Sequence, residues 1–186
     1  IEKYITIPYQ KKNALQKKDK EIELDIGVDW QLRQKNFLIE NYKKTRFYDE
    51  IIKDIDPLFL KKYTKLIDVL TDSINYLVKV FEIQTQIVYQ SDLVYDRSKK
   101  RNELLVELCK AVSCDLYLSG NGARTYMDLS VFESQGINVE FQKFLYPVYD
   151  QGKFWVPNLS SLDILFRTGK DTSKQLFWEN LNGYKH

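Results

Sequence analysis

Hydrophobic positions at helical spacing mark the first half of the chain as a set of helices. The longest apolar stripe predicts a core-facing helix over residues 63–81. A shorter stripe predicts a helix that begins at Trp30 and is capped by Asp29, and a further helical segment covers residues 47–55. We expect that segment to end at Asp56-Pro57, because a residue before proline disfavours helical geometry. Together these elements form a helical insert over about residues 30–81.

Alternating and β-branched stretches predict strands on both sides of this insert. Residues 4–9 and 21–26 are expected to form an N-terminal hairpin around a lysine-rich loop. After the insert, the predicted order is strand, helix, strand, helix, strand, an alternation typical of a parallel sheet. The bounds are 85–90, 99–112 (capped by Ser98), 115–118, 129–134 and 137–142.

Two more helices are expected near the end of the chain. The first contains the apolar residues from 162 to 166 and ends at Gly169 as its C-cap, and Asp171 caps the second. The sequence thus predicts one α/β domain over residues 1–186, with a mostly parallel sheet, flanking helices, the N-terminal hairpin and the helical insert.

Composition excludes several classes of function. The formal net charge is +2, with 28 basic and 26 acidic residues, which argues against a dedicated nucleic-acid binder. No apolar run is long enough to span a bilayer and no signal peptide is recognisable, so a cytoplasmic protein is expected. Tyrosine dominates a 14% aromatic content. This suits sugar or nucleobase contacts, and it equally suits half-buried packing.

The scarcity of histidine and cysteine limits the chemistry further. The one histidine is His186, so Ser-His-Asp or Cys-His catalysis and His-rich metal sites are close to excluded within this sequence. Cys109 and Cys114 do not form a CxxC motif and are expected to be buried and reduced. A general base would be a carboxylate, a lysine or a tyrosine. No particular cofactor and no metal site is indicated.

The turn after the strand at 115–118 is the first candidate binding site. Ser119, Gly120 and Gly122 lie where a parallel strand ends, which is where open α/β sheets bind ligands. The glycines would let backbone N–H groups approach an anion, and Arg124 would pair with a phosphate or carboxylate. A tight turn whose glycines only satisfy backbone geometry explains the same residues, and the pattern alone does not decide between the two.

Two further segments carry polar side chains beside predicted elements. Asn158, Ser160 and Asp163 are candidates for binding or catalysis, although capping of the following helix and its dipole account for them without a ligand. Glu140 alternates with apolar neighbours in its strand. It is a candidate general base for an amine, and a solvated edge position is the other interpretation.

These segments together resemble the WbqC-like family, whose members are encoded in bacterial surface-polysaccharide gene clusters. An Asn-Tyr-Lys run at 41–43 also fits the family pattern, and the resemblance extends from about residue 4 to residue 169. The blocks that carry it are Tyr-Leu-Ser-Gly-x-Gly at 117–122 followed by Tyr126, Gly-Ile-x-Val-x-Phe-Gln at 136–142, Tyr-Pro-x-Tyr at 146–149, and Pro-Asn-Leu-Ser-x-x-Asp-x-Leu-Phe-x-x-Gly at 157–169. The family pattern also places a His-Gln-Pro-x-Tyr-x-Pro-Trp segment and an Asp-rich strand before the position of Ile1. A fragment, a trimmed domain or an inactive relative would each lack that segment and its histidine.

The resemblance implies a role in O-antigen biosynthesis, with glycyl transfer to an amino sugar as the suggested activity. The expected substrate is a nucleotide-linked sugar, and its diphosphate would bind at the turn from Ser119 to Arg124, with Tyr126 nearby. Asn158, Ser160 and Asp163 would orient the amine. This hypothesis expects Arg124 and Asp163 to converge on one pocket; a catalytically silent binding or scaffold protein and a nucleotidyltransferase-like enzyme are the alternatives.

Overall fold

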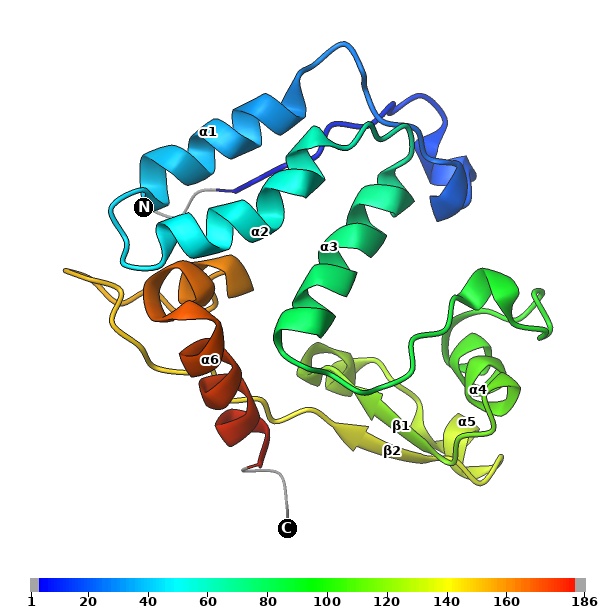
Figure 1. The fold of residues 1–186 in the computed structure, drawn as a ribbon. Coiled ribbons are helices and arrows are strands. Elements are labelled where there is room, and N and C mark those ends of the chain that lie inside the picture. Colours follow the sequence, from blue (N-terminus) through cyan, green and yellow to red (C-terminus); the bar gives the residue numbers. More distant parts are fainter. Residues whose placement is uncertain (1–3, 183–186) are drawn as a thin grey trace. The chain divides into compact units, whose positions relative to one another are not determined.

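The computed structural model describes residues 4–182, and within them the chain forms two compact units. The first unit contains residues 4–84 and 146–182, and the second contains residues 85–145. The only histidine, His186, lies outside the described residues. Figure 1 labels the elements, which are α1 (Trp30–Tyr42), α2 (Tyr48–Leu60), α3 (Leu66–Val80), α4 (Arg101–Ala111), β1 (Leu116–Ser119), α5 (Leu129–Glu133), β2 (Asn138–Phe141) and α6 (Ser161–Asn182), with short 3-10 helices at Ala14–Gln16, Asp19–Glu21, Gln90–Asp92 and Asn121–Thr125.

In the first unit, α1, α2, α3 and α6 pack around an apolar core (Figure 1). Its buried members are Leu38, Ile51, Ile55, Phe81, Leu165 and Phe166. The predicted helices over 30–42 and 63–81 are confirmed, and each contributes to this core or to its edge. Apolar burial of this kind is the main source of stability for amphipathic helices.

The second helix does not end at Pro57 as expected but continues to Leu60. Leu58 and Phe59 pack against the core, which compensates for the hydrogen bond that proline removes. The amide of Gln31 also donates to the carbonyl oxygens of Leu58, Phe59 and Lys61, at 3.2, 3.0 and 2.8 Å. These bonds satisfy acceptors that a helix end leaves open.

The N-terminal hairpin is reduced to a single antiparallel bridge between Tyr9 and Leu24. The nitrogen of Gln10 donates to the carbonyl of Glu23 at 2.9 Å, and the ladder does not extend beyond this region into full strands. The nitrogen of Leu24 donates to the carbonyl of Thr64. The second predicted strand of the hairpin, residues 21–26, therefore bonds to the segment before α3 as well as to the first.

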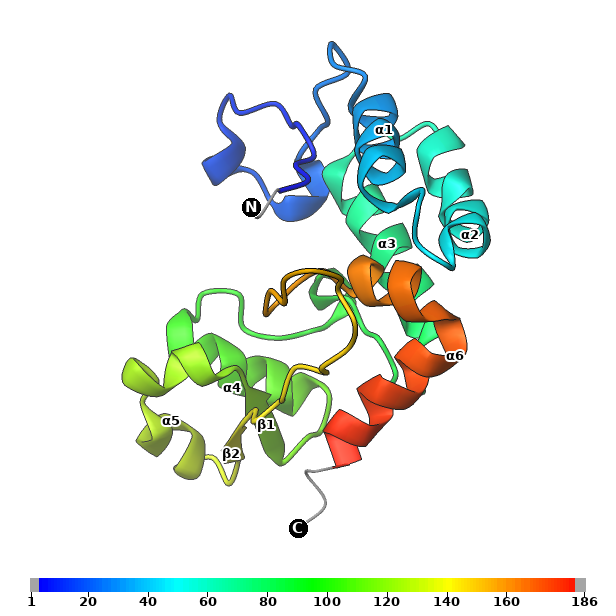
Figure 2. The same cartoon turned by 90° about the vertical axis from the view of Figure 1, so that its left-hand side faces the viewer.

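In the second unit, β1 and β2 form a parallel pair, with Leu116 opposite Asn138 and Ser119 opposite Phe141. The connection between them passes through α5, and α4 and α5 contact each other beside the pair (Figure 2). The α/β class and the parallel strands at 116–119 and 138–141 are therefore confirmed. The strand expected over residues 85–90 does not form, and the hydroxyl of Ser98 bonds to Asp96 while α4 begins at Arg101.

Gly169 divides α6 into two helical segments, as the C-cap prediction requires. Its backbone angles, φ 78° and ψ 170°, are not helical. The nitrogen of Phe47 donates to the carbonyl of Phe166 just before this break. After it, the indole of Trp178 donates to the carbonyl of Phe81 at 2.8 Å and ties the second segment to the end of α3. Among residues 4–182, no helix is both long and apolar enough to cross a membrane.

Replacing Asp29 with alanine should lower the free energy of unfolding by about 1 kcal/mol. Asp29 is the N-cap of α1, and its carboxylate accepts the backbone N–H of Leu32 at 3.0 Å. Urea denaturation of the variant checks this value. Glu40→Ala on the exposed side of the same helix is the control and should change the free energy by less than about 0.5 kcal/mol. Equal losses in the two variants would contradict the capping role.

Candidate functional site

A buried carboxylate at the start of α6 is the centre of a polar cluster in the first unit. Asp163 is only 2% exposed, yet both of its oxygens lie 3.1 Å from Nε of Arg167. The hydroxyl of Tyr149 donates to Oδ2 at 2.8 Å, and Tyr42 forms a second hydrogen bond to the carboxylate. A buried charge is tolerated only when it is paired and hydrogen bonded, and Asp163 meets both conditions.

Three sequence blocks that are far apart in the chain meet at Asp163. Tyr42 is the last residue of α1 and belongs to the Asn-Tyr-Lys run. Tyr149 closes the Tyr-Pro-x-Tyr block, and Asp163 is the aspartate of the Pro-Asn-Leu-Ser block. The ring of Tyr42 also stacks on Phe166, with centroids 4.5 Å apart, which fixes its hydroxyl beside the carboxylate.

Both tyrosines are held in the protonated, donating form. Burial is the largest cause that raises the pKa of Tyr42, and the neighbouring charge and hydrogen bond of Asp163 raise it further. Burial followed by the hydrogen bond to Asp163 likewise raises the pKa of Tyr149, with Arg167 opposing the change. At neutral pH both tyrosines are therefore hydroxyl donors beside Asp163.

Ser160 and Asn158 precede this cluster, and their geometry matches a helix start. Oγ of Ser160 accepts the N–H of Leu162 at 3.3 Å, and its carbonyl accepts the N–H of Asp163 at 2.8 Å. The capping interpretation of Ser160 is thus seen directly. Asn158 is exposed and has φ 61°, in the left-handed region that asparagine tolerates.

The turn after β1 belongs to the second unit. Ser119 is buried, and Asn121–Thr125 form a short 3-10 helix. Gly120 has φ −68°, and neither Gly120 nor Gly122 has a positive φ. A Cβ added at either position would meet no heavy atom within 4 Å. Neither backbone geometry nor packing against the protein therefore requires glycine here, contrary to the tight-turn interpretation.

Arg124 lies across the turn with its guanidinium 4.5 Å from the ring centroid of Phe141. Its Nε donates to the side chain of Asn121 at 3.3 Å. Tyr126 follows and is 75% exposed. Stacking on an aromatic ring orients an arginine while leaving its terminal nitrogens accessible, an arrangement suited to phosphate.

Glu140 is not brought together with Arg124. It directly precedes Phe141 in β2, and successive side chains of a strand point to opposite faces. Glu140 instead lines a hollow of about 570 Å³ that also includes Asp115 and Glu133. Arg124 and Asp163 belong to different units, so their convergence on one pocket stays a prediction.

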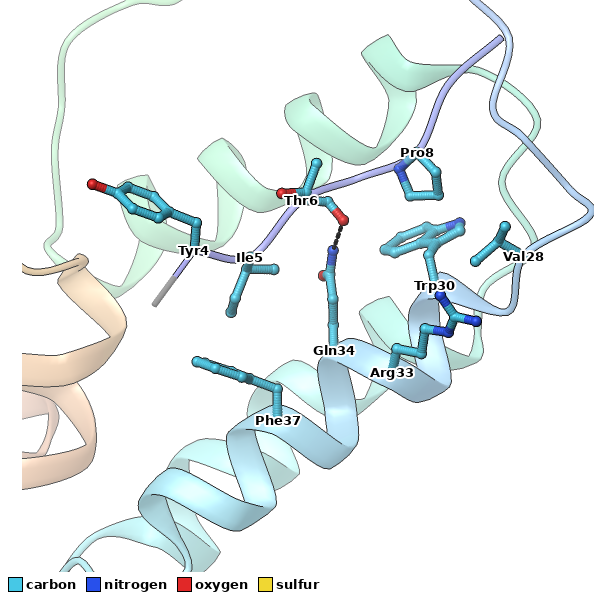
Figure 3. Close-up of a pocket in the computed structure, with 9 residues that line it drawn as sticks. All are labelled: Tyr4, Ile5, Thr6, Pro8, Val28, Trp30, Arg33, Gln34 and Phe37. Atoms are coloured by element: carbon cyan, nitrogen blue, oxygen red, sulfur yellow. Dashed lines mark hydrogen bonds between the residues drawn. The ribbon is translucent and has the colours of Figure 1, made fainter. Parts of the chain in front are cut away.

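The first unit has a hollow of its own, of about 380 Å³, which lies between the N-terminal segment and α1 (Figure 3). Tyr4, Trp30 and Phe37 supply aromatic walls, and Arg33 lies at its side. The amide of Gln34 donates to the carbonyl of Thr6 at 3.0 Å across it. Trp30 and Phe37 recur at near-helical spacing, which predicts an apolar helix face and does not indicate this hollow.

Sequence reasoning also did not single out Arg167, Tyr42 or Tyr149 as site residues. The spacing of Asp163 and Arg167, one helical turn apart, was a usable signal for an ion pair. The two tyrosines carry no local signal, because only the tertiary fold brings them to Asp163. Among the described residues, no group of three or more His, Cys, Asp and Glu side chains is arranged to hold a metal ion.

Comparison with known proteins agrees with the resemblance that the sequence blocks indicate. A model of the WbqC-like protein family matches residues 1–175. The chain belongs to the WbqC-like family. An uncharacterized protein of Mycobacterium tuberculosis, Rv1507c, is 30% identical over 178 residues, which is 93% of this chain and 75% of that protein. No solved structure matches. The family match spans both units and includes the Asp163 cluster and the turn of Arg124.

Proposed function

We propose that this WbqC-like protein is a transferase of bacterial surface-polysaccharide biosynthesis that attaches an acyl or aminoacyl group, such as glycyl, to a nucleotide-linked amino sugar. The observation that carries the proposal is the turn after β1. Gly120 and Gly122 are not required by the fold and leave open space on the turn that also carries the oriented guanidinium of Arg124. A diphosphate needs close approach to the backbone and a planar cation, and this turn offers both.

The reaction in this proposal is an acyl transfer. The amine of the sugar attacks the carbonyl carbon of an activated acyl donor, a C–N bond forms, and the bond to the leaving group breaks. The amine loses a proton to a base during this step. Glu140, in the same unit as Arg124, is the exposed carboxylate that we propose as this base, acting on an amine that extends past the strand end to the opposite face of β2. Asp163 would act by holding the tyrosines and Arg167 in place.

The Gly122→Ala variant distinguishes a ligand-binding turn from a turn with a structural role alone. We expect its free energy of unfolding to stay within about 1 kcal/mol of the wild type, because the added Cβ meets open space. Its affinity for a nucleotide-linked amino sugar, tested first with UDP-glucosamine by titration calorimetry, should fall at least tenfold, as should that of Arg124→Gln. Gly136→Ala, at φ 70°, is the opposite control, since it should affect stability and not affinity. Equal affinity in wild type and Gly122→Ala would contradict the proposed site.

A non-catalytic binding protein of polysaccharide assembly is the second candidate. The position of Glu140 favours it, because this carboxylate points to the face of β2 opposite to Phe141, on which the guanidinium of Arg124 stacks. Mass spectrometry of the amino sugar after incubation with an activated glycyl donor distinguishes the two. Binding with a gain of one aminoacyl group supports the transferase, whereas binding without any gain supports the second candidate.

A further inference from the structure

Arg167 uses only one of its five N–H donors within the described part of the chain. Nε donates to both oxygens of Asp163 at 3.1 Å, in a shared bond. Arginine–carboxylate pairs are frequently bidentate, with two nitrogens of the guanidinium fork on two oxygens. Here Tyr149 and Tyr42 occupy the remaining acceptor sites of Asp163 instead. Neither Nη atom of Arg167 has a described acceptor, and the side chain is 26% exposed.

The loop over residues 151–156 lies beside Arg167 and is held by internal hydrogen bonds. A Cβ on Gly152 would lie 4.0 Å from Nη1, and Gly152 has φ 89°. The side chain of Gln151 ties the loop by bonding to both the N–H and the carbonyl of Val156, at 2.6 and 3.0 Å. The loop carries Trp155, which is 50% exposed. The loop that passes Nη1 of Arg167 at Gly152 therefore also carries an exposed aromatic ring.

We infer that Arg167 and the loop over residues 151–156 form a second ligand site, which binds a sugar carrying an oxyanion. The Nη atoms would bind the carboxylate or phosphate oxygens as a fork, and Trp155 would stack on the apolar face of the sugar ring. Asp163 is a positioning residue in this site. It fixes Nε, so the fork is oriented before the ligand arrives and less conformational entropy is lost on binding. The inference stands whether or not the turn at Arg124 binds a nucleotide.

The charges around the fork favour a ligand with one anionic group rather than a polyanion. Asp163 offsets the charge of Arg167, and the further cation in the loop is Lys153, which is exposed and lies 5.3 Å from the ring centroid of Phe154. Affinity would then come from directed hydrogen bonds and stacking together, so neither a bare anion nor a neutral sugar should bind as well as the combined ligand.

Titration of the full chain, followed by NMR of arginine side chains, tests this site. The Nε–Hε resonance of Arg167, identified by its loss in Arg167→Lys, should shift saturably with glucose 1-phosphate or with glucuronate at constant ionic strength. A saturable shift with glucose 1-phosphate alone identifies a phosphate ligand. A saturable shift with glucuronate alone identifies a carboxylate ligand. Inorganic phosphate, acetate and glucose should each bind at least fivefold more weakly than the better of the two.

Variants outside the polar cluster make the test specific. Trp155→Ala should weaken the saturable binding about fivefold, because it removes the stacking surface. Arg46→Gln, an exposed arginine of the same unit without a carboxylate partner among the described residues, should leave it unchanged. A resonance of Arg167 that does not shift with either sugar anion, or that shifts equally with acetate and with glucuronate, would overturn the inference.

Discussion

Gly169→Ala should lower the free energy of unfolding by about 3 kcal/mol, the sum of a backbone and a steric cost. The backbone angles of Gly169, φ 78° and ψ 170°, lie in a region that is essentially reserved for glycine. An ideal Cβ would also lie 2.7 Å from Cδ1 and Cε1 of Phe47, which is closer than real contacts allow. Phe47 is partly buried and packs against the core of the first unit, so moving its ring away would loosen that packing. Thermal and urea denaturation measure the loss.

Two matched variants separate the causes of this destabilisation. Gly120→Ala adds the same methyl group at φ −68° in open space, so its effect should stay below about 1 kcal/mol. Phe47→Leu combined with Gly169→Ala relieves the steric part and leaves the backbone part. The double variant should therefore lose less than the sum of the two single changes. A cost of Gly169→Ala equal to that of Gly120→Ala would contradict this account.

The break at Gly169 was predictable from the sequence, whereas the continuation of α2 past Pro57 was not. A glycine after an apolar helical stripe is a local signal, and its positive φ follows from its missing Cβ. Pro57 is also a local signal, but here tertiary packing overrides it. Leu58 and Phe59 gain burial in the core, and Gln31 supplies donors from another helix. A reading of the α2 segment alone contains neither of these partners.

The parallel pair of strands was predictable for a similar reason. Residues 116–119 and 138–141 each have neighbours that bury one face, such as Phe132, so their pattern agrees with their environment. Residues 85–90 have the same β-branched composition and form no strand. Ile87, Val88 and Tyr89 are 46, 47 and 43% exposed. A strand there would therefore bury no apolar face, and its formation would not be stabilised.

Only parts of the candidate site follow from the sequence. The helix start at Ser160 and the family blocks were visible, but the burial of Asp163 depends on Tyr42 and Tyr149, which lie in distant segments. The first-turn position of Asp163 suggested a carboxylate that the helix dipole favours. Its actual role depends on tertiary contacts, which no periodicity reports.

Asp163→Ala should destabilise the first unit by about 3–5 kcal/mol, the usual cost of breaking a buried ion pair from one side. The change leaves the guanidinium of Arg167 and the hydroxyls of Tyr42 and Tyr149, all partly buried, without their shared acceptor. Asp171→Ala, an exposed position on the following segment of α6, should cost less than about 0.5 kcal/mol. Urea denaturation of both variants gives the comparison.

A double-mutant cycle with Tyr149→Phe decides whether Asp163 acts through its hydrogen bonds. In the wild type, loss of the Tyr149 hydroxyl removes a 2.8 Å bond to Oδ2 and should cost about 1 kcal/mol. In an Asp163→Ala background the same change removes a hydroxyl that already lacks its acceptor, so its cost should vanish or change sign. The coupling between the two positions is then about 1 kcal/mol or more. If Tyr149→Phe costs the same in both backgrounds, the carboxylate does not anchor the tyrosine, and the meeting of the three sequence blocks at Asp163 would reflect packing of their apolar neighbours alone.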